Sequence, residues 1–304
     1  MNLEQKEKRE RLWSLLGSLP PHTRPVDGKI TRERESDSYI LQEIILDAGG
    51  LEPVSGYFIK PRNLSGPAPA ILYHHHHGGN YHVGARELIE GWAGLQNPPY
   101  AQEFASRGWV ALCMDMWNFG KRHTRTESSL FKEMLWRGQV LWGMMVYDAV
   151  KALDYLCSRS EVDTNWIGAF GMSMGSTMAW WLAALDERIK VCVDLCCLTD
   201  FDALIEAGGL DKHGLYYYVP GLLNHFSTAD INALIAPRPH LSLAGARDAL
   251  TPPEGLDRID RHLQKVYKEF EVPEAWKLYR EDTGHQETPT MRKQILAWLE
   301  RWLV

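Results

Sequence analysis

Three residues of this sequence have the types and surroundings needed to turn a serine into a nucleophile. Ser173 lies in the stretch Gly171-Met172-Ser173-Met174-Gly175, Asp248 follows a glycine-containing turn, and His285 directly follows Gly284. A serine hydroxyl is a weak nucleophile until an imidazole takes its proton, and a carboxylate orients that imidazole. In the order Ser173, Asp248, His285, these residues predict acyl transfer through an acyl-enzyme.

The residues around Ser173 predict a sharp turn between a strand and a helix. A short apolar run, 166–170, precedes the serine, and apolar residues recur at helical spacing from 174 to 185. Such a turn strains the backbone and leaves little room two positions to either side of the serine, so glycine suits both places. The alternative is a chance Gly/Ser turn, because G-x-S-x-G is a weak pattern without this context.

His285 and Asp248 are the expected base and acid because each follows a predicted strand. His285 comes after the strand expected over 276–279, and Asp248 comes after the strand expected over 239–244. A turn at the end of a strand can deliver its side chain to the edge of the sheet where the serine turn lies. The plainer alternatives are a solvated loop histidine and an acid at a helix N-terminus. Rival bases are His213, His225, His240 and His262, and rival acids are Asp194, Asp200, Glu254 and Asp282.

Backbone N–H groups are expected to bind the oxyanion that develops during acyl transfer. One donor should be Met174, which directly follows the nucleophile. The other should be Gly78 or Gly79, in the loop after the strand that ends at Tyr73. Glycine suits this loop because it lets the backbone approach a substrate closely.

Four consecutive histidines, His74 to His77, precede those glycines and raise the question of a metal site. In an extended segment successive side chains point to opposite faces, which leaves about two imidazoles on each side. Two ligands are too few for a closed zinc site. We therefore expect the run to support the oxyanion loop by packing and hydrogen bonding, without a metal. Zinc binding is the alternative.

Length, composition and charge exclude several classes of protein. The 304 residues are 45% hydrophobic and 24% charged, which is enough to bury a sizeable core. The net charge of −6 gives no basic surface for nucleic acid. The N-terminal residues, 1–11, are highly charged and lack the pattern of a signal peptide. No stretch of the sequence approaches the ~18 apolar residues of a membrane span. We expect a cytoplasmic protein with reduced thiols at its five cysteines, with a redox role for Cys196-Cys197 as the alternative.

Strands and helices alternate from Ala70 onward, which predicts a mostly parallel sheet with helices on both faces. Ahead of it, 39–46 and 54–60 have strand character and predict an antiparallel hairpin. We expect one α/β catalytic domain over 38–304. The segment 1–37 should hold a helix over 1–19 and a polar linker, packed on that domain. The helix could instead join copies of the chain into a homo-oligomer.

A long irregular segment, 198–236, separates the strand after the serine turn from the strand before Asp248. Insertions of this length in compact domains tend to be functional, so we expect a lid-like segment near the active site. Aromatic residues here and in the loop 116–129 would line an apolar pocket for small or medium esters, with Trp117, Phe119 and Tyr217 contacting the substrate. The alternative is that these aromatics only pack the segment on to the domain.

Taken together, these motifs resemble the α/β-hydrolase superfamily. Within it the chain is most similar to the dienelactone hydrolase and acetyl xylan esterase-like group, related to prolyl oligopeptidase-type catalytic domains. The resemblance covers 38 to the C-terminus and is carried by 73–80, 115–122, 171–175, 236–239 and 284–285. It implies an α/β-hydrolase fold with an eight-stranded sheet, a Ser-His-Asp triad and no cofactor. Dienelactone hydrolases proper use a cysteine nucleophile, so serine at position 173 favours another ester.

The sequence thus predicts a serine hydrolase that cleaves small-molecule carboxylic esters. Cleavage of thioesters or amides on the same triad is one alternative. A catalytically silent α/β-hydrolase fold that serves as a binding module is an alternative of a different class. The complete set of Ser173, Asp248 and His285 argues against the silent module.

Overall fold

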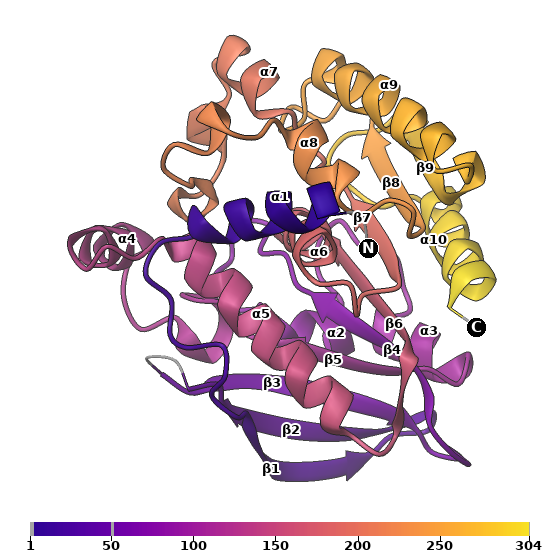
Figure 1. Cartoon of the computed structure of the whole chain (residues 1–304). Helices are drawn as coiled ribbons and strands as arrows, with labels where there is room; N and C mark the ends of the chain where they lie inside the picture. Colours follow the sequence, from indigo (N-terminus) through magenta and orange to yellow (C-terminus); the bar gives the residue numbers. More distant parts are fainter. Residues whose placement is uncertain (1–2, 50–51, 304) are drawn as a thin grey trace.

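A mixed sheet runs through the middle of the molecule (Figure 1). The computed structural model describes residues 3–49 and 52–303, so Met1 and Asn2 of the expected N-terminal helix lie outside the described residues. The strands are β1 (Asp27–Glu35), β2 (Tyr39–Asp47), β3 (Val54–Pro61), β4 (Ala68–His74), β5 (Val110–Met114), β6 (Val162–Met172), β7 (Val191–Leu195), β8 (His240–Gly245) and β9 (Trp276–Glu281).

The strand order of the sheet confirms the expected architecture. Within the described residues, nine strands form one sheet in the order β1-β2-β3-β5-β4-β6-β7-β8-β9. The pairs β1·β2, β2·β3 and β3·β5 are antiparallel, and every other neighbouring pair is parallel. The predicted hairpin and the mostly parallel sheet are therefore both present, and β6 to β9 end at a common edge.

The expectation of eight strands is corrected to nine, because β1 forms in the stretch that we expected to be a polar linker. β1 pairs with β2 from Asp27 opposite Asp47 to Glu35 opposite Ile40. Nearly all its residues are exposed, so no apolar alternation marks it as a strand in the sequence. Backbone pairing with β2, rather than burial of its own side chains, defines this strand.

Helices cover both faces of the sheet, as the alternation predicts (Figure 1). One face packs against α5 (Leu141–Ser158), α6 (Met174–Leu185), α8 (Thr228–Ala233) and α9 (Pro253–Glu269). The other packs against α2 (Glu87–Glu90), α3 (Tyr100–Ser106) and α10 (Pro289–Trp302). Because side chains alternate along a strand, Leu72 of β4 joins the first cluster while Ile71 and Tyr73 join the second.

The N-terminal helix α1 (Leu3–Ser14) is fixed to the rest of the chain by a buried arginine. Arg9 donates from Nε to the carbonyl of Ala184 (2.9 Å) and from Nη2 to that of Leu234 (2.8 Å). Its Nη1 lies 2.8 Å from the Glu187 carboxylate. The helix ends before the predicted Leu19, and the chain then turns at Gly17, where φ is +78° and a backbone bridge joins it to Gln139.

The segment between β7 and β8 consists of short helices that contact the loops at the sheet edge. They are α7 (Phe201–Glu206), η3 (Leu210–Lys212), η4 (Leu215–Tyr217), η5 (Leu222–Asn224) and α8. The Nε2 atom of His213 lies 3.2 Å from the carbonyl oxygen of Leu250, and the Tyr216 N–H donates to Glu127 (3.0 Å) at the start of α4 (Glu127–Trp136). The remaining short helices are η1 (Gly84–Arg86), η2 (Gly120–Arg122) and η6 (Pro273–Ala275). No helix in 3–49 or 52–303 has the length and apolarity needed to cross a membrane.

Candidate active site

Ser173 occupies a strained turn between β6 and α6, as its flanks predict. Its backbone has φ 55° and ψ −118°, a conformation that costs free energy for any residue with a Cβ. The Ser173 N–H donates to the carbonyl of Leu195 at the end of β7 (2.8 Å). A Cβ at Gly171 would lie 2.5 Å from the His74 carbonyl oxygen, and one at Gly175 only 1.9 Å. The two glycines are therefore required because the end of β4 packs directly against the turn.

The loops after β8 and β9 bring Asp248 and His285 together. The Nδ1–H of His285 donates to Oδ2 of Asp248 over 2.7 Å. The Asp248 side chain is 1% exposed, whereas that of His285 is 24% exposed, so the imidazole is the more accessible partner. The loops touch closely, because a Cβ at Gly245 would lie 2.2 Å from the Gly284 carbonyl oxygen. This contact fixes the imidazole tautomer with its proton on Nδ1 and leaves Nε2 as the basic nitrogen.

Cys196 lies between the serine turn and the Asp248–His285 pair. It directly follows Leu195, whose carbonyl accepts the Ser173 N–H. The Cys196 Sγ atom, one carboxylate oxygen of Asp248 and one ring nitrogen of His285 all lie within 4.8 Å of one another. Burial, together with the nearby Asp248 carboxylate, raises the pKa of the Cys196 thiol well above its ordinary value. The thiol therefore stays protonated, and its Sγ lies 3.7 Å from the carbonyl oxygen of Gln286. All five cysteines are free.

The rival candidates lie in other surroundings. Nε2 of His240 is 2.7 Å from Oδ2 of Asp194, and both side chains are fully buried. Ser242 also donates to Asp194 (2.8 Å), so this pair belongs to the core beneath α6. His213 is half-buried, and its ring stacks on Tyr217 with 4.7 Å between centroids. His285 is therefore the histidine of this set that pairs with an acid at the sheet edge.

The histidine run ends β4, and its first two members are buried and neutral. Burial lowers the pKa of His74 to about 3. Its Nε2 has no hydrogen-bond partner among the described residues. His75 accepts the Met116 N–H at Nε2 (3.1 Å) and donates from Nδ1 to the carbonyl of His76 (3.0 Å). Burial lowers the pKa of His75 despite the nearby Glu87 and Asp115.

The other two histidines tie the loop to its neighbours. Both ring nitrogens of His76 face acceptors: Nδ1 lies 2.6 Å from Glu87 Oε2, and Nε2 lies 3.1 Å from the Ala93 carbonyl oxygen. Burial opposes the charge on His76, but Glu87 outweighs it and the pKa is raised. His77 accepts the Gly79 N–H at Nδ1 (3.0 Å), and its Nε2 is 3.0 Å from the Tyr216 hydroxyl. Burial and His76 lower the pKa of His77 to about 4.

These contacts bear on the second oxyanion donor. The Gly79 N–H already donates to His77, and the His76 N–H donates to Glu87 (3.0 Å). Gly78 has φ +52°, and a Cβ there would lie 2.9 Å from Nε1 of Trp92. Of the two glycines, Gly78 is therefore the better candidate, whereas Met174 stands at the first position of α6 as expected.

The three aromatic residues expected at the substrate are all buried. Trp117 is 3% exposed, Phe119 1% and Tyr217 6%. The Arg122 guanidinium lies 4.2 Å above the Trp117 ring, and Phe119 stacks on Tyr81 with 4.6 Å between centroids. Tyr217 lines an apolar cavity of about 250 Å³ within the inserted segment. These positions favour the packing alternative for Trp117 and Phe119, and substrate contact stays a prediction.

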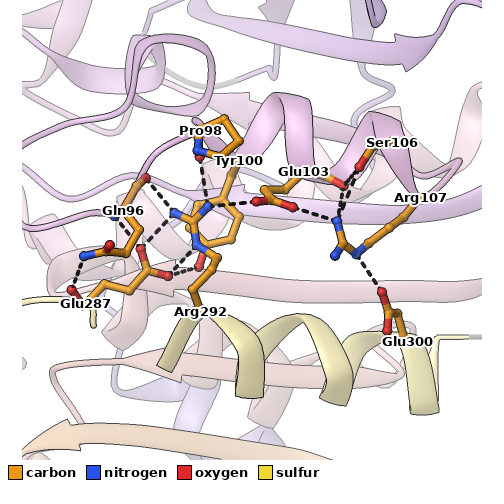
Figure 2. Close-up of polar contacts among 9 residues, drawn as sticks. All are labelled: Gln96, Pro98, Tyr100, Glu103, Ser106, Arg107, Glu287, Arg292 and Glu300. Atoms are coloured by element: carbon orange, nitrogen blue, oxygen red, sulfur yellow. Dashed lines mark hydrogen bonds and ion pairs between the residues drawn. The ribbon is translucent and has the colours of Figure 1, made fainter. Parts of the chain in front are cut away.

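Two buried carboxylates beside the site are not singled out by the sequence pattern. Glu87 accepts from Tyr73 Oη (2.6 Å) and contacts His76, while Glu287 lies two residues after His285 and contacts Tyr100 and Arg292 (Figure 2). A glutamate in a loop or a short polar helix carries no periodicity that would mark it as buried. The only sequence signal is the closeness of Glu287 to the candidate base.

Known sequences and structures are similar to this chain. The model of the dienelactone hydrolase family matches residues 87–274, more than half of the chain, and this range includes Ser173 and Asp248. A protein of Bacillus subtilis (strain 168) named "Putative hydrolase YtaP" is 48% identical over 297 residues, which cover 98% of this chain and 99% of that protein.

Solved structures share the fold at low sequence identity. A structure described as a "putative acetyl xylan esterase" from Bacteroides fragilis has a TM-score of 0.76 at 18% identity and covers 98% of this chain and 86% of its own. A glucuronoyl esterase from Solibacter usitatus has a TM-score of 0.69 at 15% identity, with 96% and 91% covered. These likenesses confirm the α/β-hydrolase fold expected from the sequence. From its sequence matches, the chain belongs to the dienelactone hydrolase family.

Proposed function

We propose that this protein is a serine hydrolase that cleaves carboxylic esters of small or medium size through an acyl-enzyme. The observation that carries the proposal is the 2.7 Å contact between His285 Nδ1 and Asp248 Oδ2, on loops that adjoin the strained turn of Ser173. An imidazole held in this tautomer presents Nε2 as a base, which is the arrangement that activates a serine hydroxyl.

The reaction would proceed in two halves. In the first, Ser173 Oγ attacks the ester carbonyl while His285 Nε2 takes its proton. The tetrahedral intermediate places its negative charge at the N–H of Met174 and at the glycine loop, and it collapses as the alcohol leaves with the proton from His285. In the second, water attacks the acyl-enzyme while His285 takes its proton, and the acid is released as the acyl–Oγ bond breaks and Ser173 Oγ receives that proton from His285. Asp248 stabilises the imidazolium formed in each half.

The comparisons support an ester as the bond that is cleaved. Both solved structures named above carry esterase in their descriptions, and the family model is that of a hydrolase family. The limit on substrate size is inferred from the inserted segment, which contacts the histidine loop through Tyr216 and the Asp248 loop through His213. A segment joined to both loops narrows the approach to Ser173, which favours small esters over polymers.

The test compares the full-length protein with Ser173→Ala on a series of aryl esters graded in acyl length. We expect the substitution to reduce turnover by on the order of 10⁶-fold and to abolish labelling by a fluorophosphonate probe. Ser160→Ala, at an exposed position, is the matched control and should behave like the unmodified protein. Full turnover in Ser173→Ala would disprove the mechanism. A folded native protein that neither turns over these esters nor reacts with the probe would favour a silent binding module.

A further inference from the structure

One short segment, 92–96, is bonded to both of the loops that the proposed reaction needs. On one side it contacts the histidine loop after β4. The Trp92 Nε1–H donates to the carbonyl of His77 (3.1 Å), and the carbonyl of Ala93 accepts from His76 Nε2 (3.1 Å). This side of the segment therefore helps to define where the candidate oxyanion loop lies.

On its other side the same segment contacts the loop that carries His285. The Glu287 N–H donates to the carbonyl of Gly94 (2.7 Å), and the Gln96 N–H donates to the Glu287 carboxylate (2.7 Å). The Gln96 side-chain amide also donates to the Glu287 carbonyl (2.8 Å). Three hydrogen bonds thus join the segment to a residue only two positions from the candidate base.

The Glu287 carboxylate is fully buried and is held by charged and neutral donors (Figure 2). Arg292 at the start of α10 donates from Nε (2.7 Å) and Nη2 (2.8 Å), and the Tyr100 hydroxyl donates to the same carboxylate. Arg292 is itself fixed, because it donates to the carbonyls of Pro98 (2.9 Å) and Gln96 (2.8 Å) and lies 3.8 Å above the Tyr100 ring.

The free-energy balance of this cluster favours a role in positioning groups over a role in stabilising the fold. Removing two charges from water costs several kcal/mol, and a buried ion pair often contributes no net stability compared with apolar residues of the same volume. A bidentate arginine–carboxylate contact does impose a defined geometry, because its two hydrogen bonds are parallel and directional. An imidazole displaced by about 1 Å can lose on the order of 10²-fold in rate, so such a constraint matters next to a catalytic base.

We propose that Glu287, held by Arg292, is a positioning residue that sets the place of His285 and, through 92–96, keeps the His285 loop in register with the histidine loop. This inference rests on the proposed function of His285 as the base. Glu287 itself does not take part in the chemistry. It acts through backbone hydrogen bonds and a buried carboxylate.

The experiment compares Glu287→Gln with Glu300→Gln in the full chain. Glu287 lies just before the start of α10, whereas Glu300 lies in the last turn of the same helix. Glu300 pairs with Arg107 at 2.7 Å but is 51% exposed, so its variant removes the same charge at the opposite end of the helix (Figure 2). We expect Glu287→Gln to lower kcat on a short-chain aryl ester at least tenfold with KM within twofold. The rate of fluorophosphonate labelling should fall by the same factor, while the final stoichiometry remains one per chain. Glu300→Gln should match the unmodified protein.

A second readout does not depend on turnover. The Nδ1 proton of His285, hydrogen-bonded to Asp248, should give a downfield NMR resonance that shifts or broadens in Glu287→Gln and is unchanged in Glu300→Gln. Tyr100→Phe removes one donor to Glu287 and keeps the ring, so it decides the question if Glu287→Gln does not fold. We expect about a threefold loss of kcat and a smaller shift of the same resonance.

The outcomes separate the two proposals. If Glu287→Gln and Tyr100→Phe, both folded, keep unmodified kcat and an unmodified His285 resonance, the positioning role is disproved, whatever Ser173→Ala does. If the native protein shows no ester turnover or labelling, the proposed function fails, and the NMR resonance alone then decides whether Glu287 sets the place of His285.

Discussion

His285 Nδ1 lies 2.7 Å from Asp248 Oδ2, although 37 positions separate the two residues along the chain. They meet because β8 and β9 are parallel neighbours, and the turns that follow them leave the sheet at the same edge. The Arg247 N–H donates to the Thr283 carbonyl (2.9 Å), which joins the two turns directly. The partnership of acid and base is thus a consequence of strand order.

Asp248→Asn should remove the negative charge that orients His285 and stabilises its protonated form. An amide at this position can also present its N–H to Nδ1 and select the wrong tautomer, so we expect kcat to fall by on the order of 10⁴-fold with little change in folding. Steady-state kinetics on an aryl ester measures this. Asp282→Asn is the control, since that carboxylate is 83% exposed in the neighbouring turn. Equal kcat values for the two variants would contradict the role of Asp248.

Gly175→Ala should disrupt the serine turn by a clash that cannot be relieved by a side-chain movement. The new Cβ would lie 1.9 Å from the His74 carbonyl oxygen, which is backbone. We expect the free energy of unfolding to fall by about 1–3 kcal/mol and the labelling of Ser173 to be lost. Gly66→Ala, with nothing within 4 Å of its Cβ, should change neither. Urea unfolding and probe labelling of both variants provide the test, and a native-like Gly175→Ala would refute the close packing.

The histidines of the run whose pKa values are lowered by burial, His74, His75 and His77, should make the protein less stable in mild acid. Burial lowers the pKa of His74 from 6.5 to about 3, so below pH 6.5 the unfolded chain binds a proton that the folded chain does not. The free energy of unfolding therefore falls as the pH drops from 6.5 towards the folded pKa, by up to about 1.4 kcal/mol per pH unit for each such histidine. Burial and His76 give His77, with a pKa of about 4, the same sign.

His74→Leu should remove one of these contributions and flatten the dependence of stability on pH between 6 and 4. Urea unfolding at pH 7, 6, 5 and 4 measures the slope, and His82→Leu, which replaces an exposed histidine of the following loop, should keep the native slope. An unchanged slope in His74→Leu would show that this imidazole does not titrate differently on unfolding.

Chelation should leave ester hydrolysis intact. Both ring nitrogens of His75 and of His76 face protein donors or acceptors, and His77 contacts Gly79 and Tyr216. A metal could bind these imidazoles only by displacing those partners. Turnover measured before and after dialysis against EDTA checks this, with a zinc-dependent esterase as the positive control. Activity that is lost with EDTA and restored by zinc would reverse the conclusion.

The central parallel strands of the fold were predictable because β5, β7 and β8 are buried at every position, on both faces of the sheet. β5 coincides with the predicted run 110–114. The serine turn could be predicted because its two glycines are needed there. The backbone of His74 lies so close to Gly171 and Gly175 that no side chain would fit. β1 could not, because an edge strand with exposed side chains has the same composition as a polar linker.

The long-range polar contacts of Glu287 could not be predicted from sequence. The Gln96 amide reaches Glu287 across 191 positions, and only the packing of α10 against the loop 92–99 brings them together. The aromatics of the loops were ambiguous for another reason. Phe119 would have the same sequence context whether it lined a pocket or packed under the histidine loop, and its 1% exposure is a property of the assembled chain.

The strand β1, which was not predicted from the sequence, also affects how copies of this protein can meet. β1 is the end strand of the sheet, so its outer backbone groups offer a template for pairing with a foreign strand. It presents charged side chains on both faces, Lys29, Arg32, Glu33, Arg34 and Glu35. A second sheet that docked there would have to accommodate those charges, so growth into fibrils or extended sheets is disfavoured at this margin. Any assembly of the protein should therefore leave the β1 margin unpaired, and this margin should stay free at high concentration.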